Sequence, residues 1–413
     1  MKKNFFLGLG FVLFLGVSTC FGSGFALYEW STRGNGLGGT LIGRADDVST
    51  IAYNPAGLTQ TSGIQTMFGV TAIAPDVDIK ANGQTTSQNN NFYFPPHFYI
   101  SAQLNSKAWL GIGEFSRFGL ATDFPSDWIG RFNAYYTAIK SYSIQPTLAI
   151  KLTNNLSMGL GFEAMYFEFT KQQKKNLGPL GEIDAQVQGD SLSYGFTLGF
   201  HYRPVDWLRI GAVYRSEIKH TVKGKARFDR PAQLMTIHPD WFQGTTAQGD
   251  ICLPEAYGLG LTVYPWSNLS IEADLIYTRW SSYQDLTIEY GDDLTPPLGT
   301  TSSSSKKNWK DTYRLQLGIE YQATQRLSLR ASYIYDQTPI PDEHIEYMLP
   351  ANNRHLFGLG AGYKWNNLSI DLSYNYLRYE NRDIEARPAD YVYAGEILNG
   401  HAHLLGLSLG YRF

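Results

Sequence analysis

Patterns that could support catalysis or metal binding are few in this sequence. His401 and His403 are two residues apart, so on a β-strand both imidazole rings would lie on one face and could bind a metal ion. Serine, histidine and acidic residues are present, but neither a nucleophile elbow nor zinc-ligand spacing accompanies them. The sequence therefore predicts that the protein is not an enzyme and has no cofactor or metal site. A hydrolase that uses a strand serine and histidine is the alternative.

The spacing of aromatic residues is a stronger signal, and it indicates binding. The segment 123–136 reads DFPSDWIGRFNAYY. Read as a helix, it carries rings every three or four residues, which form one apolar stripe: Phe124, Trp128, Phe132 and Tyr135. Exposed on a loop, such a stripe predicts a groove that captures an apolar ligand. The alternative is that the stripe packs onto neighbouring loops.

The amino-acid composition indicates which class of protein carries these aromatic residues. The 413 residues carry a net charge of −3, and only 17% of them are charged. Because nucleic-acid binding needs a basic surface, this balance predicts no nucleic-acid partner. Glycine (41 residues), tyrosine (28) and phenylalanine (23) are abundant, which favours β structure with many tight turns.

A secretory signal peptide is predicted over residues 1–22. Two lysines precede the apolar run FFLGLGFVLFLGV, which is too short to span a bilayer, and small residues follow it. Cleavage is expected after Gly22 or Ser23, and a lipoprotein acylated at Cys20 is the alternative. After cleavage only Cys252 would remain, so no intramolecular disulfide is available. No later stretch reaches the ~20 apolar residues of a transmembrane helix.

Alternation with a period of two runs through the rest of the chain. In SLSYGFTLGFHYR (191–203), leucine, tyrosine and phenylalanine fall on one face, and mostly polar residues and glycine fall on the other. Short turns and long polar segments alternate between stretches of this kind. Seven long loops and six short turns require 14 strands. Many of these strands have the roughly 9–11 residues that a tilted strand needs to cross a bilayer.

This pattern predicts an all-β fold, a 14-stranded antiparallel transmembrane β-barrel over residues 64–413, in the bacterial outer membrane. Short turns would face the periplasm and long loops would face outward. The last segment, HLLGLSLGYRF, ends on Phe413 and suits a strand that closes the barrel against the first, because an unpaired edge in lipid leaves backbone groups without partners. A soluble secreted β-sandwich is the alternative, but it does not explain the order of the connections.

A barrel of this width needs a plug or leaves a channel. The glycine-rich residues 23–63 lack sustained alternation and are predicted to fold inside as an N-terminal hatch. Arg44, Asp46 and Asp47 could pair there with the polar inner face of the barrel. A non-selective porin with an open lumen is the alternative, and the length of this segment argues against it.

The chain also resembles a known family. The segments GFALYEWSTRGNGLGGT and ADDVSTIAYNPAGLT resemble the N-terminal hatch of the FadL/TodX-type outer-membrane transporters of long-chain fatty acids and hydrocarbons. FGLATDFP (118–125), LPEAYGLG (253–260) and WKDTYRLQLGIEY (309–321) resemble later family segments, so the resemblance covers nearly all of the mature chain. It implies passive transport by capture among the loops, binding in the lumen, hatch movement and lateral release into the membrane.

The resemblance also implies roles for single residues. Asn54, Pro55 and Ala56 match the hatch motif near the family's kinked third strand and would form part of the gate. A simple turn inside the plug is the alternative. Gly119 would lie at the kink that opens the wall, or would simply end a strand. Phe25 matches a residue that lines the internal ligand site, and ordinary hatch packing is its alternative.

Two lysines are implied at the head group of the ligand. Lys310 matches a basic residue near the internal ligand carboxylate, with pairing to Asp311 as the alternative. A second basic residue of the family falls around 168–173, where EFTKQQ holds no arginine and Lys171 is the candidate replacement. The missing arginine leaves room for an uncharged hydrocarbon. The expected partners are a hydrophobic small molecule and outer-membrane lipid, and the chain is expected to be a monomer.

Overall fold

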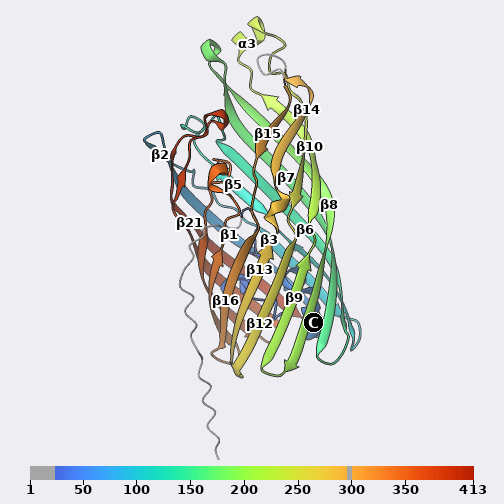
Figure 1. The fold of residues 1–413 in the computed structure, drawn as a ribbon. Coiled ribbons are helices and arrows are strands. Elements are labelled where there is room, and N and C mark those ends of the chain that lie inside the picture. The colour runs from blue at the N-terminus through green and yellow to red at the C-terminus, as the bar shows by residue number, and fades with distance from the viewer. Residues whose placement is uncertain (1–23, 295–299) are drawn as a thin grey trace, which may run out of the picture.

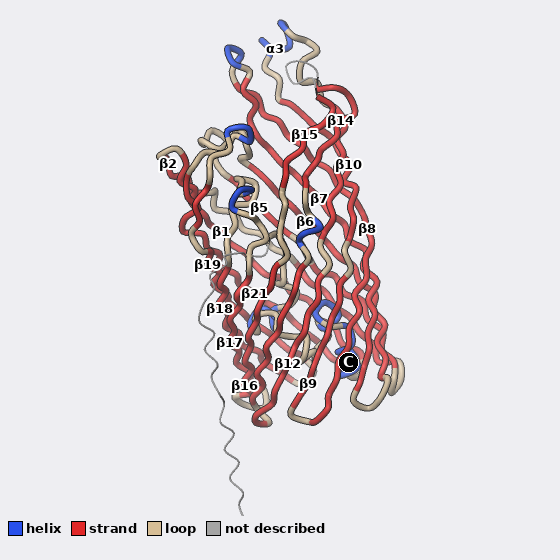
Figure 2. The backbone as a smooth tube through the Cα atoms, in the orientation of Figure 1, coloured by secondary structure: helices blue, strands red, loops and turns tan. Residues whose placement is uncertain are grey.

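The computed structural model describes residues 24–294 and 300–413 of the chain. The predicted signal peptide, residues 1–22, lies outside the described residues. The backbone forms one continuous wall of long tilted strands, drawn as arrows in Figure 1 and in red in Figure 2. Within the described ranges, no helix is both long and apolar enough to cross a membrane.

Fourteen strands of the described residues form the wall, as the order of short and long connections predicted. Five of them are interrupted and carry two labels each. In chain order they are β1 (Ile64–Ala81), β3 (Pro96–Gln103), β4 (Ala108–Phe115) with β5 (Gly119–Asp123), β6 (Tyr136–Lys151), β7 (Leu156–Asn176), β8 (Glu182–Val205), β9 (Leu208–Arg215) with β10 (Ile218–Phe228), β11 (Thr245–Leu253) with β12 (Ala256–Trp266), β13 (Leu269–Thr278) with β14 (Asp285–Leu294), β15 (Thr300–Lys306) with β16 (Thr312–Gln322), β17 (Leu327–Asp336), β18 (Arg354–Trp365), β19 (Leu368–Tyr379) and β21 (Gly395–Arg412).

The remaining elements are short. The N-terminal segment holds α1 (Thr32–Gly36), α2 (Thr50–Tyr53) and η1 (Pro55–Gln60). The connections hold β2 (Gln84–Ser87), η2 (Gly178–Leu180), α3 (Ala232–Ile237), η3 (Trp280–Ser282), η4 (Asp342–His344), β20 (Arg382–Ile384) and η5 (Pro388–Asp390).

The first and last wall strands close the barrel. β1 pairs antiparallel with β21 over most of its length, for example Phe68 with Leu409 and Val70 with Leu407. This closure follows from the solvent, because in lipid an open sheet edge would leave N–H and C=O groups without partners. The predicted 14-stranded antiparallel barrel is confirmed, and so is the closing role of the C-terminal strand.

Side chains alternate between the two faces of the wall. In β8, Leu192, Tyr194 and Phe196 point outward and are 57%, 58% and 43% exposed. Thr197, the next residue, is fully buried and points to the interior, where its hydroxyl donates a hydrogen bond to Gln145 Oε1 on β6. The apolar face therefore meets lipid and the polar face meets the interior, as the period of two predicted.

Residues 24–63 lie within the wall, where Figure 2 shows their short helices behind the strands. The helix α1 packs against β18 and β19, and η1 packs against β6, β7 and β8. Arg44 is fully buried and lies 3.4 Å from the Glu272 carboxylate on β13, so this segment meets a charged partner on the inner face of the wall. The segment ends where β1 begins.

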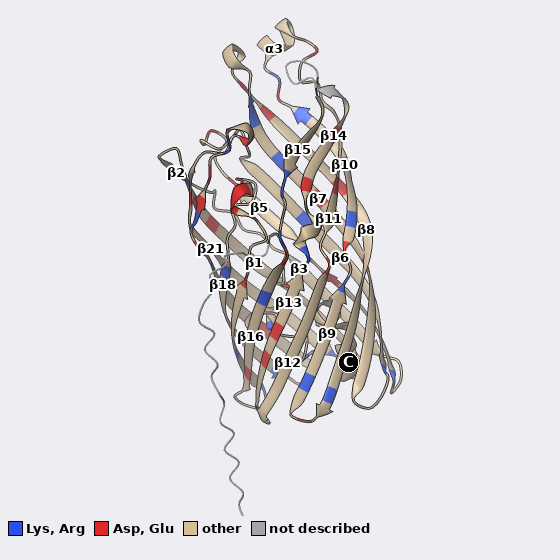
Figure 3. Cartoon of the chain, viewed as in Figure 1, with Lys and Arg blue, Asp and Glu red and all other residues tan. Residues whose placement is uncertain are grey.

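The two ends of the barrel differ in length and in charge. Strands around β8, β10 and β14 rise beyond the rest at the end that carries α3 (Figure 1). Lysine, arginine and acidic residues colour these extensions in Figure 3. Because outer-membrane barrels place long connections outside and short turns in the periplasm, this end is the outer end.

The outward face of β21 provides a test of the membrane placement. Leu407 lies on it between His403 and Tyr411, four residues from each. In the variant Leu407→Arg a charge lies against hydrocarbon, so we expect the free energy of unfolding to fall by ~2–4 kcal/mol. Urea titration of the barrel in lipid vesicles measures this change.

The matched control is Leu407→Met, which keeps volume and apolar character and should cost less than ~1.5 kcal/mol. An arginine variant as stable as the unaltered protein would contradict the placement of this face in lipid.

Candidate functional site

The wall is broken in its third strand. β4 ends at Phe115 and β5 begins at Gly119, and the residues between them leave the ladder. β4 pairs with both β3 and β6, whereas in the described chain β5 pairs as a strand with β6 alone. One edge of β5 therefore faces no wall strand. Where that edge meets lipid, its N–H and C=O groups need another hydrogen-bond partner.

The N-terminal segment supplies that partner. Leu27 N donates to Arg117 O at 2.8 Å, and Gly119 N donates to Phe25 O at 2.9 Å. Residues 25–27 therefore act as a short extra strand on the broken edge. A Cβ at Gly119 would lie 2.6 Å from Leu27 Cδ1, so a larger residue there would require the Leu27 side chain to move. The structure thus places Gly119 directly at the break.

A cavity of about 370 Å³ opens at the break. Tyr28 and Arg314 line it from the interior, whereas Phe92 and Phe94 line it from the outer surface. The rings of Phe92 and Phe94 are 66% and 61% exposed and stack with their centroids 6.5 Å apart. The cavity therefore extends from buried residues of the interior to exposed rings beside the break.

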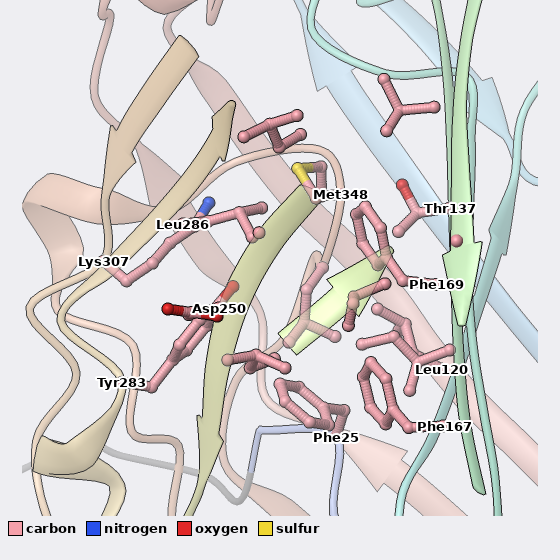
Figure 4. A pocket seen from close by; sticks show the side chains of 18 of the residues that line it. Phe25, Leu120, Thr137, Phe167, Phe169, Asp250, Tyr283, Leu286, Lys307 and Met348 are labelled. Carbon is pink, nitrogen blue, oxygen red and sulfur yellow. The ribbon is translucent and has the colours of Figure 1, made fainter. Parts of the chain in front are cut away.

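A second cavity, of about 60 Å³, lies within the barrel and is drawn in Figure 4. Its lining is mainly apolar and aromatic: Phe25, Leu120, Phe167, Phe169, Tyr283, Leu286, Trp309 and Met348. Three residues, Leu120, Ile139 and Leu349, line both cavities. The inner cavity and the cavity at the break therefore adjoin.

Two charged residues in the lining of the inner cavity form an ion pair. Lys307 Nζ donates hydrogen bonds to the Glu346 carboxylate and, at 3.2 Å, to Ser305 Oγ. Burial alone would raise the pKa of Glu346, but the charges of Lys307 and Lys171 outweigh it and hold that pKa below its ordinary value. Glu346 is therefore ionised, and the pair contributes no net charge to the cavity.

The loop between β17 and β18 fixes the position of Glu346. On one side of it, Arg387 donates a hydrogen bond to the Ile345 carbonyl. On the other side, Tyr347 N donates to Asn133 Oδ1 at 3.2 Å. Because both neighbours are held, the carboxylate can leave Lys307 by rotating its side chain while the loop stays in place.

The structure separates the three residues that the family resemblance implied at this site. Phe25 is in the lining of the inner cavity. Lys171 is half-buried on β7, and its charge acts on Glu346. Lys310 is exposed and lies outside the lining, so its role at the head group stays a prediction. The buried lysine of the lining is Lys307, three residues earlier.

Sequence analysis missed both members of the ion pair. The run KKNWK over 306–310 offers three lysines, and only the path of the chain between β15 and β16 decides which one turns inward. Glu346 lies in a loop without periodicity, so no pattern in the sequence could have identified it.

The predicted helix with an exposed aromatic stripe is absent. Residues 124–135 form consecutive turns, and Phe124 and Trp128 are buried with ring centroids 4.4 Å apart. Trp128 also meets the Tyr347 ring at 4.8 Å, while Phe132 is half-buried. The rings pack onto neighbouring loops, which was the alternative interpretation, because stacking against other rings removes their apolar surface from water. In this arrangement Phe124 and Trp128 are closed to a ligand from outside.

Asn54, Pro55 and Ala56 lie against a cradle of glycines on the wall. A Cβ at Gly199 on β8 would fall 2.2 Å from Asn54 Oδ1, and one at Gly159 on β7 would fall 2.5 Å from Ala56 N. Asn54 Nδ2 donates to the carbonyls of Ile42 (2.8 Å) and Phe200 (3.0 Å). The motif therefore contacts β7 and β8, and its role in a gate stays a prediction.

A chain of contacts joins this motif to the break. Arg215 donates hydrogen bonds to the carbonyls of Ala52 and Tyr53, just before Asn54. Its guanidinium group lies over the Trp30 ring, 4.6 Å from the centroid. Trp30 Nε1 in turn donates to Ser116 O at 2.9 Å, within the break. The motif and the break are thus connected through two side chains.

The sequence matches one family over almost its whole length. Residues 13–413 match the family described as outer membrane protein transport protein (OMPP1/FadL/TodX). The chain belongs to this family. Members of the OMPP1/FadL/TodX family are outer-membrane transport proteins, so the predicted location is confirmed, and so is the prediction that the protein is not an enzyme.

Individual members of the family show how far the similarity extends. The long-chain fatty acid transport protein of Escherichia coli O6:H1 is 27% identical over 433 residues, which cover 95% of this chain and 94% of that protein. Among solved structures, a Pseudomonas aeruginosa FadL homologue has a TM-score of 0.84 at 22% identity, covering 95% and 100% of the two chains. The Ralstonia pickettii toluene transporter TbuX has a TM-score of 0.71 at 17% identity, covering 94% and 99%.

The glycine cradle generates a prediction about the plug. In Gly199→Val, the added side chain would collide with Asn54 and Pro55, so we expect overpacking to weaken the seating of this segment by ~1–3 kcal/mol. Displacement of the segment should open the lumen to ions. Single-channel conductance in a planar bilayer measures it.

Gly244→Ala is the control, because its Cβ would meet only the Ala226 carbonyl oxygen, at 3.4 Å. If the valine variant conducts no more than the alanine control, Gly199 does not hold the segment in place.

Proposed function

We propose that this protein carries long-chain fatty acids or similar hydrophobic compounds through the outer membrane passively, as a monomer. One observation supports this proposal above the others: the inner cavity adjoins the cavity at the break, through Leu120, Ile139 and Leu349. An apolar lining that leads from the lumen to the lipid-facing surface suits a ligand that leaves sideways. No step of this route needs an energy source.

The inner cavity holds the ligand first. Its volume of about 60 Å³ is too small for an acyl chain, so the aromatic and aliphatic side chains of the lining move apart to admit the chain, and Lys307 takes the carboxylate in place of Glu346. A charge-assisted hydrogen bond from a buried ammonium group is strong, so Lys307 keeps a carboxylate partner after the exchange, and the displaced Glu346 keeps the positive charge of Lys171 nearby. The half-buried Lys171 adds positive charge nearby.

Residues 23–63 act as the hatch, and residues 25–27 form its moving part. Two backbone hydrogen bonds connect 25–27 to the broken strand, at Arg117 and Gly119. When they separate, the ligand passes beside β5 into outer-membrane lipid. The tail is favoured there by ~0.8 kcal/mol per CH₂ group, which drives release toward lipid and not toward the periplasm.

A neutral hydrocarbon is the second candidate ligand, and a specific observation favours it. The charge of Lys307 is already neutralised by Glu346, so an uncharged molecule can fill the apolar part of the inner cavity without breaking the pair. The similarity to the toluene transporter TbuX is consistent with such a ligand.

Uptake by cells that lack their own fatty-acid transporter tests the function. Cells that express this chain receive labelled oleate, hexadecane or toluene, and heat-dependent migration on gels confirms that the barrel is folded. Oleate uptake above that of empty cells supports a fatty-acid transporter, and uptake of the hydrocarbons alone selects the second candidate. Failure of all three ligands would reject the proposal.

Lys307 should distinguish charged from uncharged ligands. In Lys307→Met the carboxylate loses a charge-assisted hydrogen bond, so we expect oleate uptake to fall roughly tenfold while hexadecane uptake stays unchanged. The matched control is Lys310→Met, which removes an exposed lysine three residues away. Equal uptake of oleate by the two variants would exclude Lys307 as the head-group site.

A further inference from the structure

Arg314 on β16 is a buried cation beside the break in the wall. Its side chain is 4% exposed and is part of the lining of the 370 Å³ cavity. The guanidinium group lies over the Tyr28 ring, 3.4 Å from the centroid. Its Nε and Nη1 atoms have no hydrogen-bond partner. Buried guanidinium donors are normally satisfied, so these atoms point to a ligand that completes them.

The nearest carboxylate on the wall already has a closer partner. Asp336 Oδ2 accepts from Arg354 Nη2 at 2.6 Å but lies 3.9 Å from Arg314 Nη1. Arg354 lines the same cavity, so two guanidinium groups share one carboxylate there. Positive charge is therefore available on the inner side of the exit.

Two further charged groups, Glu29 and Lys140, line this cavity, and the negative charge of Glu29 acts on Arg354. Glu29 accepts a hydrogen bond from Tyr28 N at 2.9 Å. Lys140 pairs with Glu168 at 3.1 Å, and its side chain is largely exposed. Neither interaction satisfies Arg314, whose planar fork of donors matches a carboxylate in both geometry and charge.

We propose that Arg314 is a second binding site for the ligand carboxylate, placed at the lateral exit. The ligand class is a long-chain monocarboxylate, and the inference rests on the proposed function. The shared lining of the two cavities, at Leu120, Ile139 and Leu349, keeps the acyl chain in apolar surroundings while the head group moves from Lys307 to Arg314. The carboxylate is thus paired on both sides of the step.

This site solves a physical problem of lateral release. The acyl tail enters lipid readily, but a bare carboxylate is costly in a medium that offers it no donor. A guanidinium group at the exit stabilises the head group until it reaches the membrane interface. A neutral hydrocarbon has no such need and should pass Arg314 without using it.

The first experiment observes the carboxylate directly. Oleate labelled with ¹³C at its carboxyl carbon is added to the purified protein in detergent, and the protein-bound carboxylate resonances are recorded by NMR. We expect two bound resonances, of which Arg314→Met loses one and Lys307→Met loses the other. If Arg314→Met keeps every bound resonance of the unaltered protein, the second site is excluded.

The second experiment measures uptake in the cells described above. Arg314→Met should slow oleate uptake roughly tenfold and leave hexadecane uptake unchanged, because only the carboxylate loses a partner. Arg314→Lys keeps the charge and should restore part of the rate. The control Arg326→Met removes an exposed arginine from a turn and should change neither rate. Equal slowing of both ligands by Arg314→Met would indicate a structural role and overturn the inference.

Two readouts keep this inference apart from the proposed function. In Arg314→Met, Asp336 retains Arg354 as its partner, so the barrel is expected to fold, and heat-dependent migration on gels checks it. If the unaltered protein takes up no oleate and shows no bound resonance, the fatty-acid function itself fails. If it does both and Arg314→Met behaves identically, only the second site fails.

Discussion

Pairing of backbone groups in lipid is the constraint on which this structure depends. The wall satisfies this constraint by pairing β1 with β21. In the described wall, the ladder of backbone hydrogen bonds is interrupted between β4 and β5. There the chain uses its own N-terminal residues 25–27 as the missing strand. The same few residues therefore seal the wall at the point where we propose the lateral exit.

Ion pairs hold part of the N-terminal segment, around Arg33 and Arg44, whereas residues 25–27 are held by backbone hydrogen bonds and ring contacts. Arg33 pairs with Asp46 at 2.6 Å within the segment and with Glu320 at 2.8 Å on the wall. Arg44 is buried against Glu272. Breaking buried pairs such as these is costly, because it leaves a charge uncompensated in a medium of low polarity. Movement is therefore favoured near residues 25–27, where backbone bonds and ring contacts dominate, and the bulk of the plug remains in place.

Much of the fold could be predicted from the sequence because the strands lie in lipid. Period-two alternation, short and long connections and the terminal apolar face predicted fourteen strands and their closure, because a membrane enforces each of these features on every strand. The site was less readable. A choice among three lysines within five residues depends on the path of one short connection, and the burial of Trp128 depends on Tyr347, which lies far away in the sequence. Long-range packing of loops leaves no periodic signal in the sequence. The aromatic residues of 123–136 could therefore be identified, but the burial of Phe124 and Trp128 could not be predicted.

The neighbouring positions of β1 and β21 also set an order of events during biogenesis. β21 follows the other described wall strands in the chain, so the barrel cannot close before β21 has been made. The segment before β1 is made first and ends enclosed by the wall, seated on Gly159 and Gly199 while its polar groups face strands on the opposite side. A closed wall would bar its entry, so the plug must be in place on a curved, still open sheet before the final seam forms. Enclosure of the N-terminal segment and pairing of β1 with β21 are thus parts of one assembly step.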